Sequence, residues 1–423
     1  MNNALLSGGR QVGADARRPR RIAITIAVVI CVAYTIDYVD RAGIAMMLPA
    51  IGDTFGVSRA MQGLLVTVFA VVYMVCQIPA GIVADRVGSR FVLLATLVLW
   101  SVFTALSGLA GTFAILLALR GAFGASQGFF PAAAFKAVSE RTSPSNRATV
   151  LGVVMSSSGV AGVVAPLLVA PLLIAFGWRG SLFWLAGGGV VIGIVLWTLI
   201  PRPLQGGAGE SRQQAPDVSV RAVRRAVLRS PKVWLFAGMF CGLNFVSYGL
   251  MTWVPSYLME SRGLSISVTG VLAAIPMLAN FLVSIAGGWL FDRYFHAHVR
   301  WYLFVTMLGS AAMLALMTLA DTTGEFILFE SLAVVIGGLA TMALLGLPMR
   351  TLPPEHVGAG MGVFNFGGQV AGVAAPFLIG LLADQFSFAA GFGLLAAAGL
   401  VAAGLALRVP RRADQLAVVE ASA

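Results

Sequence analysis

Four ionisable residues stand inside long apolar stretches of this chain: Asp37, Asp40 and Arg41 in one stretch, and Arg120 in another. A charge in hydrocarbon is costly, so such residues are candidates for function by default. A guanidinium group presents planar donors that fit a carboxylate in a bidentate way. Arg41 and Arg120 could therefore clamp a carboxylate. The alternative for Arg41 is a structural ion pair with Asp37, because residues at i and i+4 of a helix meet.

The same four charges also allow proton chemistry. With both aspartates ionised, the charges of Asp37, Asp40, Arg41 and Arg120 cancel. A proton on one aspartate leaves a net charge of +1, which suits a bound monoanion. The alternative for Asp40 is a fixed partner for an arginine, or a buried polar group without a chemical role.

The composition describes the environment of these residues. The 423-residue chain is 59% hydrophobic and 11% charged, with a mean hydropathy of +0.90. Soluble domains carry roughly 25% charged residues, so this composition excludes a water-soluble enzyme, a disordered chain, collagen and a coiled coil. The three cysteines lie in apolar stretches, and the three histidines lie in or beside short polar links. We therefore expect no disulfide framework, metal site, cofactor or nucleic-acid partner. The chain also lacks the GxxxxGK[ST] loop of ATP-binding proteins.

Long apolar runs predict membrane-spanning helices, each of which needs about 20 apolar residues. The runs are continuous and lack the short alternating segments of a membrane β-barrel. We predict an all-α membrane protein with twelve transmembrane helices, near 22–49, 61–84, 91–110, 112–138, 148–173, 179–200, 233–258, 266–290, 301–320, 325–349, 357–383 and 387–408. The first run resembles a signal peptide, but its length and its three charged residues predict a retained span.

Basic residues predict the orientation of these spans. With both termini inside, the inner side holds 23 of the 28 lysines and arginines, whereas the outer loops hold only Arg59, Arg179 and Arg262. We predict a multi-pass protein of a bacterial cytoplasmic (inner) membrane with both termini cytoplasmic. The lipid bilayer is thus one partner, and a monomer is the default oligomeric state.

An internal repeat divides the chain. Residues 152–166 and 362–376 are identical at eight of fifteen positions at an offset of 210, and Gly81, Asp85 and Arg86 recur at an offset of 207. Such repeats are typical of secondary transporters. We predict two pseudo-symmetric six-helix bundles at 22–200 and 233–409, a cytoplasmic linker at 201–232, and cytoplasmic tails at 1–21 and 410–423.

The segment Gly81-Ile-Val-Ala-Asp85-Arg86-Val-Gly88-Ser-Arg90 resembles the loop signature of the major facilitator superfamily. The resemblance implies the major facilitator fold, with substrate bound between the halves and exposed to each side in turn. In that superfamily this loop latches the inner gate. The resemblance therefore implies a gating role for Gly81, Asp85, Arg86, Gly88 and Arg90, and for their counterparts Asp292 and Arg293.

A narrower resemblance is to the anion:cation symporter family, which includes proton-coupled galactonate, glucarate and phthalate transporters and lysosomal sialin. It is carried by Tyr38-Val-Asp40-Arg41, Tyr73, Arg120, Phe130-Pro131 and Asn365. The resemblance implies proton-coupled uptake of a small organic anion such as a sugar acid, hydroxy acid or aromatic acid. It also implies that Arg41 and Arg120 contact the anion and that Asp40 carries a proton.

Gln127 departs from the family pattern. The family usually has a glutamate seven residues after the arginine of the fourth span, and glutamine does not titrate, although it still forms hydrogen bonds to substrate oxygens. The family more often has asparagine where this chain has Asp37. We therefore interpret Gln127 as a substrate contact and hypothesise that Asp37 replaces the missing carboxyl group. The competing hypothesis is one proton per anion.

Further polar residues in the spans are weaker candidates for substrate contact: Tyr38, Tyr73, Ser158, Asn244, Tyr248, Asn365 and Gln369. Each has a structural alternative. Tyrosines pack between helices, amides join helices, and serines bond the backbone of their own helix.

Two other functions stay open at this point. A drug/proton antiporter of the same fold is disfavoured by two arginines in the spans and by the poor match of Ala165-Pro166-Leu167-Leu168 to the exporter signature. A non-transporting membrane sensor would need an appended signalling module, for which the linker and the C-terminal tail are short.

Overall fold

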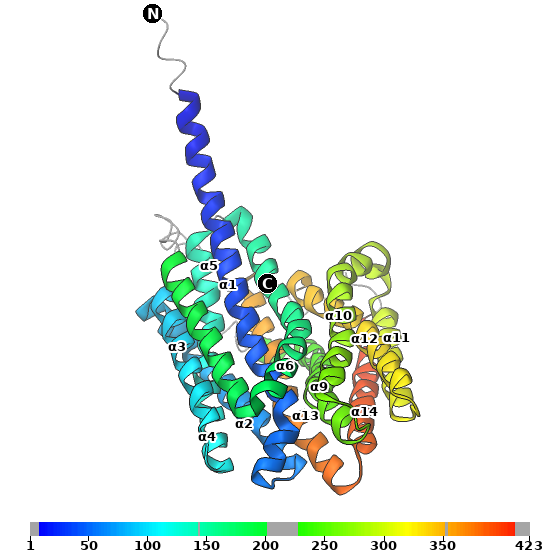
Figure 1. The fold of residues 1–423 in the computed structure, drawn as a ribbon. Helices are drawn as coiled ribbons and strands as arrows, with labels where there is room; N and C mark the ends of the chain where they lie inside the picture. The colour runs from blue at the N-terminus through cyan, green and yellow to red at the C-terminus, as the bar shows by residue number, and fades with distance from the viewer. Residues whose placement is uncertain (1–7, 143, 201–226, 352–353, 411–423) are drawn as a thin grey trace, which may run out of the picture.

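The computed structural model describes residues 8–142, 144–200, 227–351 and 354–410, and it is helical almost throughout. The first six-helix half is coloured blue to green in Figure 1. It comprises α1 (Gly8–Phe55), α2 (Arg59–Val87), α3 (Ser89–Gly108), α4 (Phe113–Gly128), α5 (Phe130–Arg141) and α6 (Pro144–Leu199).

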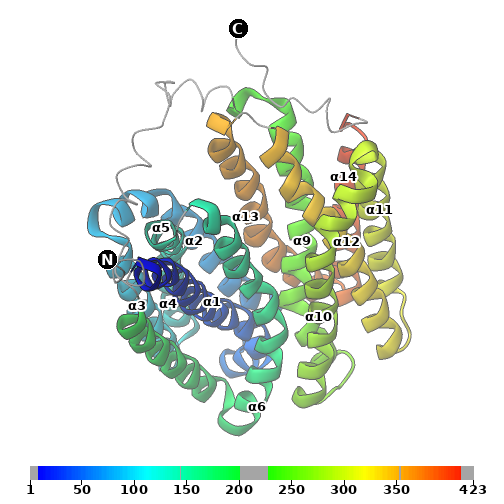
Figure 2. The same ribbon diagram turned by 90° about the horizontal axis from the view of Figure 1, so that it is seen from above.

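The second half repeats this arrangement and lies beside the first, as the view from above shows (Figure 2). It comprises α9 (Pro231–Glu260), α10 (Ile266–Leu290), α11 (Val299–Thr318), α12 (Thr323–Thr351), α13 (Pro354–Gln385) and α14 (Phe388–Ala406). Two short turns, η1 (Phe291–Phe295) and η2 (His296–His298), join α10 to α11.

Helix α6 accounts for two of the predicted spans. Among the described residues, 11 helical stretches are long and apolar enough to cross a membrane, and one of them, Val150–Leu199, has 50 residues. A straight helix of that length would measure roughly 75 Å, more than twice the thickness of the hydrocarbon core. The chain instead bends at Gly177, whose φ of 63° and ψ of −178° are non-helical. Two spans therefore lie within α6, which brings the crossings to the predicted twelve.

The fourth predicted span, in contrast, is divided in two. It ends as α4 at Gly128 and resumes as α5 at Phe130, with Pro131 in the first turn of α5. Proline is tolerated there because the first amides of a helix have no partner inside that helix. Together α4 and α5 still cross as one apolar stretch, Phe113–Arg141.

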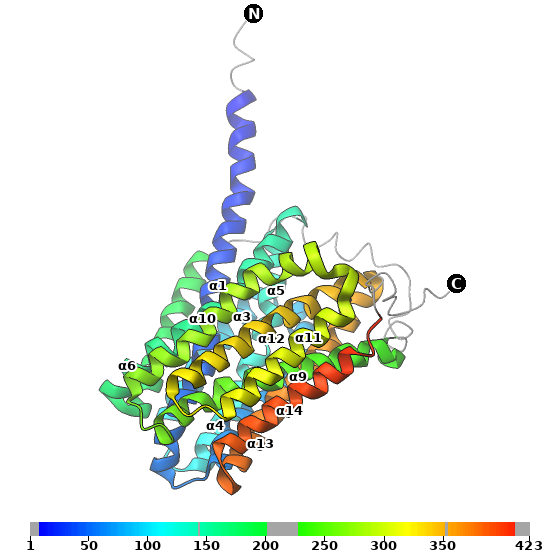
Figure 3. The ribbon, with the colours of Figure 1, turned by 90° about the vertical axis from the view of Figure 1, so that its right-hand side faces the viewer.

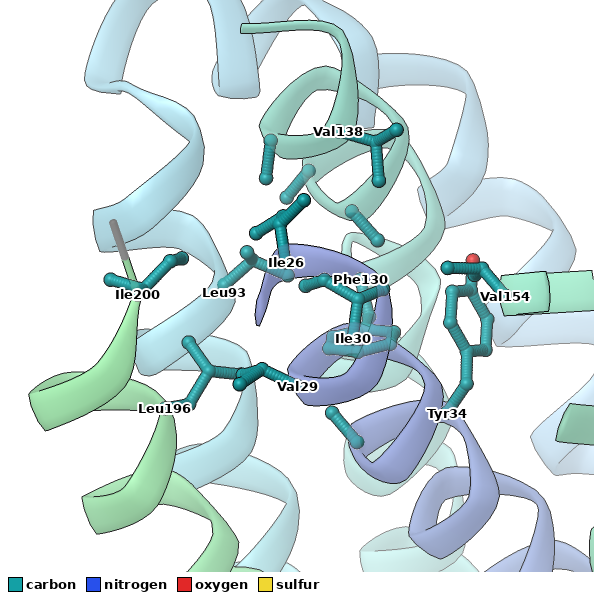
Figure 4. Packing of buried hydrophobic residues seen from close by; sticks show 14 of the residues in the cluster. Ile26, Val29, Ile30, Tyr34, Leu93, Phe130, Val138, Val154, Leu196 and Ile200 are labelled. Carbon is teal, nitrogen blue, oxygen red and sulfur yellow. The ribbon is translucent and has the colours of Figure 1, made fainter. Parts of the chain in front are cut away.

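Each half packs around α1 or its counterpart α9. In the first half, Ile26 and Ile30 of α1 are fully buried among Leu93 of α3, Phe130 of α5 and Val154 of α6 (Figure 4). Such close packing makes each half a unit that resists internal rearrangement. Beyond this core, α1 projects as a single helix toward the N-terminus (Figure 3), because residues 8–21 of the predicted tail continue the helix.

The halves meet at two equivalent points. A Cβ atom on Gly63 of α2 would collide with the carbonyl oxygen of Pro376 on α13, and one on Gly270 of α10 would lie 2.9 Å from the carbonyl oxygen of Pro166 on α6. Gly63 and Gly270 are 207 residues apart, and Pro166 and Pro376 are 210 apart. These are the two offsets of the sequence repeat, so the contacts between the halves share its pseudo-symmetry.

Both contacts lie toward one end of the bundle, here called the distal end, which carries the links at 56–58, 109–112, 261–265, 319–322 and 386–387. The carboxylate of Asp384 on α13 accepts the backbone amides of Arg59 and Ala60, at 2.9 and 2.7 Å, and so caps α2 in the other half. The Arg59 guanidinium also pairs with Glu260 of α9 at 2.8 Å. The halves are therefore joined by charge as well as by backbone contact at the distal end.

The opposite end, called the terminal end, is less tightly closed. Added Cβ atoms on Gly81 of α2, Gly152 of α6 and Gly362 of α13 would meet no atom within 4 Å in the part of the chain that the structure describes. By contrast, Gly63 of α2 and Gly270 of α10 lie directly against the backbone of the other half. The described helices thus converge at the distal end and separate at the terminal end.

Candidate functional site

A cavity of about 90 Å³ lies between the two halves. The first half contributes side chains from α1, α2 and α4, and the second half contributes side chains from α9 and α13. We call it the central cavity. Its polar lining consists of Tyr38, Arg41, Tyr73, Arg120, Tyr248 and Gln369.

Two glycines of α4 let α2 pack closely against α4, and this packing positions the side chains of α2 in the cavity. Cβ atoms on Gly124 and Gly128 would lie 2.6 Å from the carbonyl oxygen of Phe69 and 2.8 Å from that of Tyr73, both on α2. Only residues without a side chain allow two backbones to approach so closely. The rings of Phe69 and Tyr73 lie against the guanidinium of Arg41 on α1. Similarly, Gly372 of α13 leaves room for the ring of Tyr248.

Arg41 is held on several sides. Its Nη2 lies 2.7 Å from Oδ2 of Asp37, one turn earlier on α1, and its Nε donates to Oε1 of Gln127 on α4 at 2.8 Å. Its guanidinium carbon lies 4.3 Å from the ring centroid of Tyr73 and 5.2 Å from that of Tyr38. Contacts of this kind between a cation and aromatic faces are favourable in a desolvated site. The guanidinium is thus fixed in direction before any ligand binds.

Arg120 and Asp40 have fewer hydrogen-bond and ion-pair partners than Arg41 has. Arg120 of α4 and Asp40 of α1 are both buried, yet no ion pair between them is present among the described residues. Both carboxylate oxygens of Asp40, and Nε and Nη2 of Arg120, are buried without a hydrogen-bond partner there. Buried polar groups are normally hydrogen-bonded, and exceptions of this kind are typical of functional sites.

This arrangement is suited to binding an anion. Arg120 offers buried donors without acceptors, and Arg41 presents a fixed guanidinium to the same cavity. The three tyrosines add hydroxyl groups that both donate and accept. The aspartates beside the arginines can balance their charge when no anion is bound. The cavity therefore places two guanidinium groups and three phenol hydroxyls together, with two buried carboxyl groups beside them.

The structure brings most of the sequence candidates together. Tyr38, Arg41, Tyr73, Arg120, Tyr248 and Gln369 line the central cavity. Asp37 and Asp40 are buried beside it. Gln127 is fully buried and lies behind Arg41, where it orients the guanidinium instead of lining the cavity. In this structure Gln127 accepts from Arg41, and its expected contact with substrate stays a prediction.

Three candidates lie outside the central cavity. Ser158 is exposed, and its hydroxyl donates to the Met155 carbonyl of its own helix. Asn244 donates likewise to the Phe240 carbonyl. Asn365 is exposed on α13. For Ser158 and Asn244 the structure therefore shows the helix-backbone bond that competes with a substrate contact.

The signature loop lies at the terminal end, where Gly88 links α2 to α3 with a φ of 96°. Asp85 pairs with Lys136 of α5 at 3.0 Å, and Arg90 donates to the Trp197 carbonyl of α6 at 2.7 Å. Arg86 is exposed. These contacts remain within the first half.

The counterpart loop differs. Arg293 of η1 is exposed beside the rings of Trp289 and Tyr294. The side chain of Asp292 lies outside the described part of the structure. The gating role expected for both loops thus stays a prediction.

Sequence reasoning missed Glu330. This residue of α12 is 1% exposed, and its Oε2 is buried without a hydrogen-bond partner among the described residues. It falls inside the predicted span 325–349, so a complete inventory of charges in the apolar runs would have found it.

The chain belongs to the Major Facilitator Superfamily, whose family model matches residues 30–376 and 298–422. The family assignment expected from the signature loop and the half-repeat is confirmed. The protein is accordingly a multi-pass membrane transporter and not an enzyme.

Named relatives and a solved structure agree with this assignment. The chain is 27% identical to the hexuronate transporter of Bacillus subtilis over 389 residues, which cover 89% of this chain and 91% of the relative. It is also 27% identical to the D-galactonate transporter of Escherichia coli O6:H1, over 93% of this chain and 96% of the relative. A bacterial homologue of the human lysosomal transporter Spinster has the same fold, with a TM-score of 0.84, 19% identity and coverage of 95% and 99%.

Proposed function

We propose that this transporter carries a small, hydroxylated organic anion, of the sugar-acid class, into the cell together with protons. The observation that carries the proposal is the convergence of two guanidinium groups, the buried one of Arg120 and that of Arg41 (12% exposed), on one central cavity between the halves. The relatives named for hexuronate and galactonate transport support the same substrate class.

The size of the cavity favours a small cargo. At about 90 Å³, it is far smaller than the roughly 300–1,000 Å³ pockets that hold drug-sized ligands. Two arginines in its lining also repel the cationic cargo of many exporters. Both observations favour the organic-anion transporter over the drug antiporter.

The proposed mechanism uses the charge balance of the site. The anion binds Arg120 through its unpartnered donors and Arg41 from the side that faces the cavity, while the tyrosine hydroxyls bind substrate hydroxyl groups. The arrival of the anion frees Asp40 from its role as counter-charge to Arg120, and Asp40 then carries a proton. Rocking of the two halves about this site exposes it to each side of the membrane in turn.

Protein reconstituted in detergent or liposomes tests the proposal. A panel of sugar acids, hydroxy acids and aromatic acids is screened by thermal shift, and each hit is repeated with Arg120→Ala. We expect at least one sugar acid to stabilise the wild type and not the variant, because loss of one partner of a buried charge pair costs roughly 2–5 kcal/mol of binding free energy.

Arg179→Ala is the matched control, since Arg179 lies near the distal end and donates to the Ala110 carbonyl. It should leave the ligand shift intact. Stabilisation by lipophilic cations alone would instead support the drug antiporter, and a sugar-acid shift that survives in Arg120→Ala would move the anion site elsewhere.

A further inference from the structure

A second, smaller cavity of about 40 Å³ lies between the halves beside the Pro166–Gly270 contact. The first half contributes Met46 of α1 and Pro166 of α6, and the second half contributes Met277 of α10 and Glu330 of α12. Met251 of α9 borders both this cavity and the central one. We call it the Glu330 cavity.

Glu330 is the one titratable side chain in the described lining of this cavity, whose other members are alanine, glycine, leucine, methionine, proline and valine residues. The charged and titratable groups of the surrounding helices have other partners. On α1, Arg41 faces the central cavity. On α9, the Tyr257 hydroxyl accepts from Arg262. On α12 itself, Glu325 bonds the Thr322 amide.

A carboxylate without a counter-charge is costly in such surroundings, whereas a neutral carboxylic acid is far less so. Glu330 is 1% exposed and its Oε2 has no hydrogen-bond partner among the described residues. The closed cavity is therefore suited to the protonated side chain. Because both halves supply its walls, separation of the halves at the distal end would open it to water, where the carboxylate is stable.

We propose that Glu330 is a proton-binding site that couples protonation to closure of the distal end. It takes a proton from water on the distal side while the halves are apart, and an O–H bond forms on its carboxylate. Closure then buries the neutral acid. The proton leaves to water on the terminal side, past the Met251 wall shared with the central cavity. This inference rests on the proposed function and adds a coupling site away from the arginine clamp.

Proton binding and closure must favour each other reciprocally, because each changes the free energy of the other. A neutral side chain at this position should favour the closed distal end to the same extent at every pH. Glutamine is the near-isosteric test. Methionine is a second test that suits an apolar cavity and is expected to fold even if glutamine does not.

The experiment measures distal closure directly, without substrate. Spin labels at Asp53→Cys on α1 and Phe386→Cys beside α14 report the distance between the halves in nanodiscs, with the native cysteines replaced. The comparison is made in Asp40→Asn, which removes the proton carrier proposed beside Arg120. We expect the distance to shorten on acidification in D40N, and to be short and independent of pH in D40N/E330Q and D40N/E330M.

Glu325→Gln is the matched control, because it makes the same chemical change on the same helix at an exposed residue. D40N/E325Q should respond to pH as D40N does. The same pH response in D40N/E330Q would overturn the inference.

Anion counterflow in liposomes separates this inference from the proposed function. E330Q favours the closed distal end at every pH but still opens, so it should exchange anion across the membrane at a reduced, measurable rate while losing accumulation driven by a pH gradient. Absence of counterflow in the wild type would reject the proposed function. Wild-type counterflow with unchanged pH-driven accumulation in E330Q would reject the Glu330 inference alone.

Discussion

At the scale of single residues, Arg41 explains why glutamine is tolerated at position 127. The guanidinium contacts both Asp37, at 2.7 Å, and Gln127, at 2.8 Å. A carboxylate at position 127 would supply the same cation with its counter-charge from α4. In this chain the counter-charge comes from α1, one turn before the arginine. Position 37 and position 127 both contact the Arg41 guanidinium. This shared contact is a geometric basis for the hypothesis that Asp37 replaces the missing carboxyl group.

Moving the carboxyl group from position 37 to position 127 tests whether the two positions are equivalent. Asp37→Asn leaves Arg41 buried without its counter-charge, and breaking a buried pair in this way typically costs about 3–5 kcal/mol. We expect a marked loss of thermal stability and of pH-driven uptake. Adding Gln127→Glu to D37N should recover most of both, measured by thermal unfolding and liposome uptake. A double variant no better than D37N would show that the two positions are not equivalent.

At the scale of elements, the distal end is closed by a helix cap that crosses between the halves. Asp384 of α13 accepts both Arg59 and Ala60 amides at the start of α2. The unpaired amides at a helix N-terminus carry a partial positive charge that favours such a carboxylate. Most helix caps are local, and Ser58 also caps α2 locally. The Asp384 cap exists only while the halves touch, so it stabilises one conformation of the molecule.

Asp384→Ala should shift the molecule toward distal opening. Loss of a cap costs about 0.5–2 kcal/mol, which corresponds to a change of about 2-fold to 30-fold in the ratio of distal-closed to distal-open molecules. The spin-label distance between residues 53 and 386 measures that ratio. Ser387→Ala is the control, since Ser387 caps α14 within its own half. Equal distance changes in both variants would argue against a special role for the crossing cap.

At the scale of the whole molecule, the distribution of basic residues predicts that the distal end lies outside the cytoplasm. The described distal links carry few of them, whereas the described terminal end carries Arg86, Arg90, Arg141, Arg293 and Arg300. Cytoplasmic loops are enriched in lysine and arginine. The present conformation would then be sealed toward the outside and separated toward the cytoplasm, and distal closure would follow loading from outside.

Thiol labelling on intact cells tests the orientation. Single cysteines at Asp53, on the distal end, and at His298, on the terminal end, are introduced into a variant lacking Cys31, Cys76 and Cys241. A membrane-impermeant maleimide should label D53C and leave H298C unmodified until the membrane is permeabilised. Labelling of H298C on intact cells would reverse the orientation.

The sequence predicted the fold more completely than the site, for a physical reason. Bilayer thickness sets the length of each apolar run, and the half-repeat is visible as identical residues at a fixed offset. The twelve crossings and the two halves could therefore be predicted from the sequence. Helical spacing in the sequence shows which residues share one face of a helix. It does not show which residues of another helix that face contacts. Gln127 was therefore expected in the cavity, although it lies behind Arg41, and Ser158 was expected there, although it bonds its own helix. Glu330 stands in its apolar run without a motif around it, and only the fold shows that the other half covers it.

The two glycine–proline contacts have a geometric consequence. Two rigid bodies that touch at two separate points keep one easy motion, a rotation about the line through those points. Gly63 on Pro376 and Gly270 on Pro166 define such a line close to the distal end. Rotation about it moves the terminal ends of the helices farthest and the distal ends least. The protein can therefore widen its terminal end while its distal end stays closed.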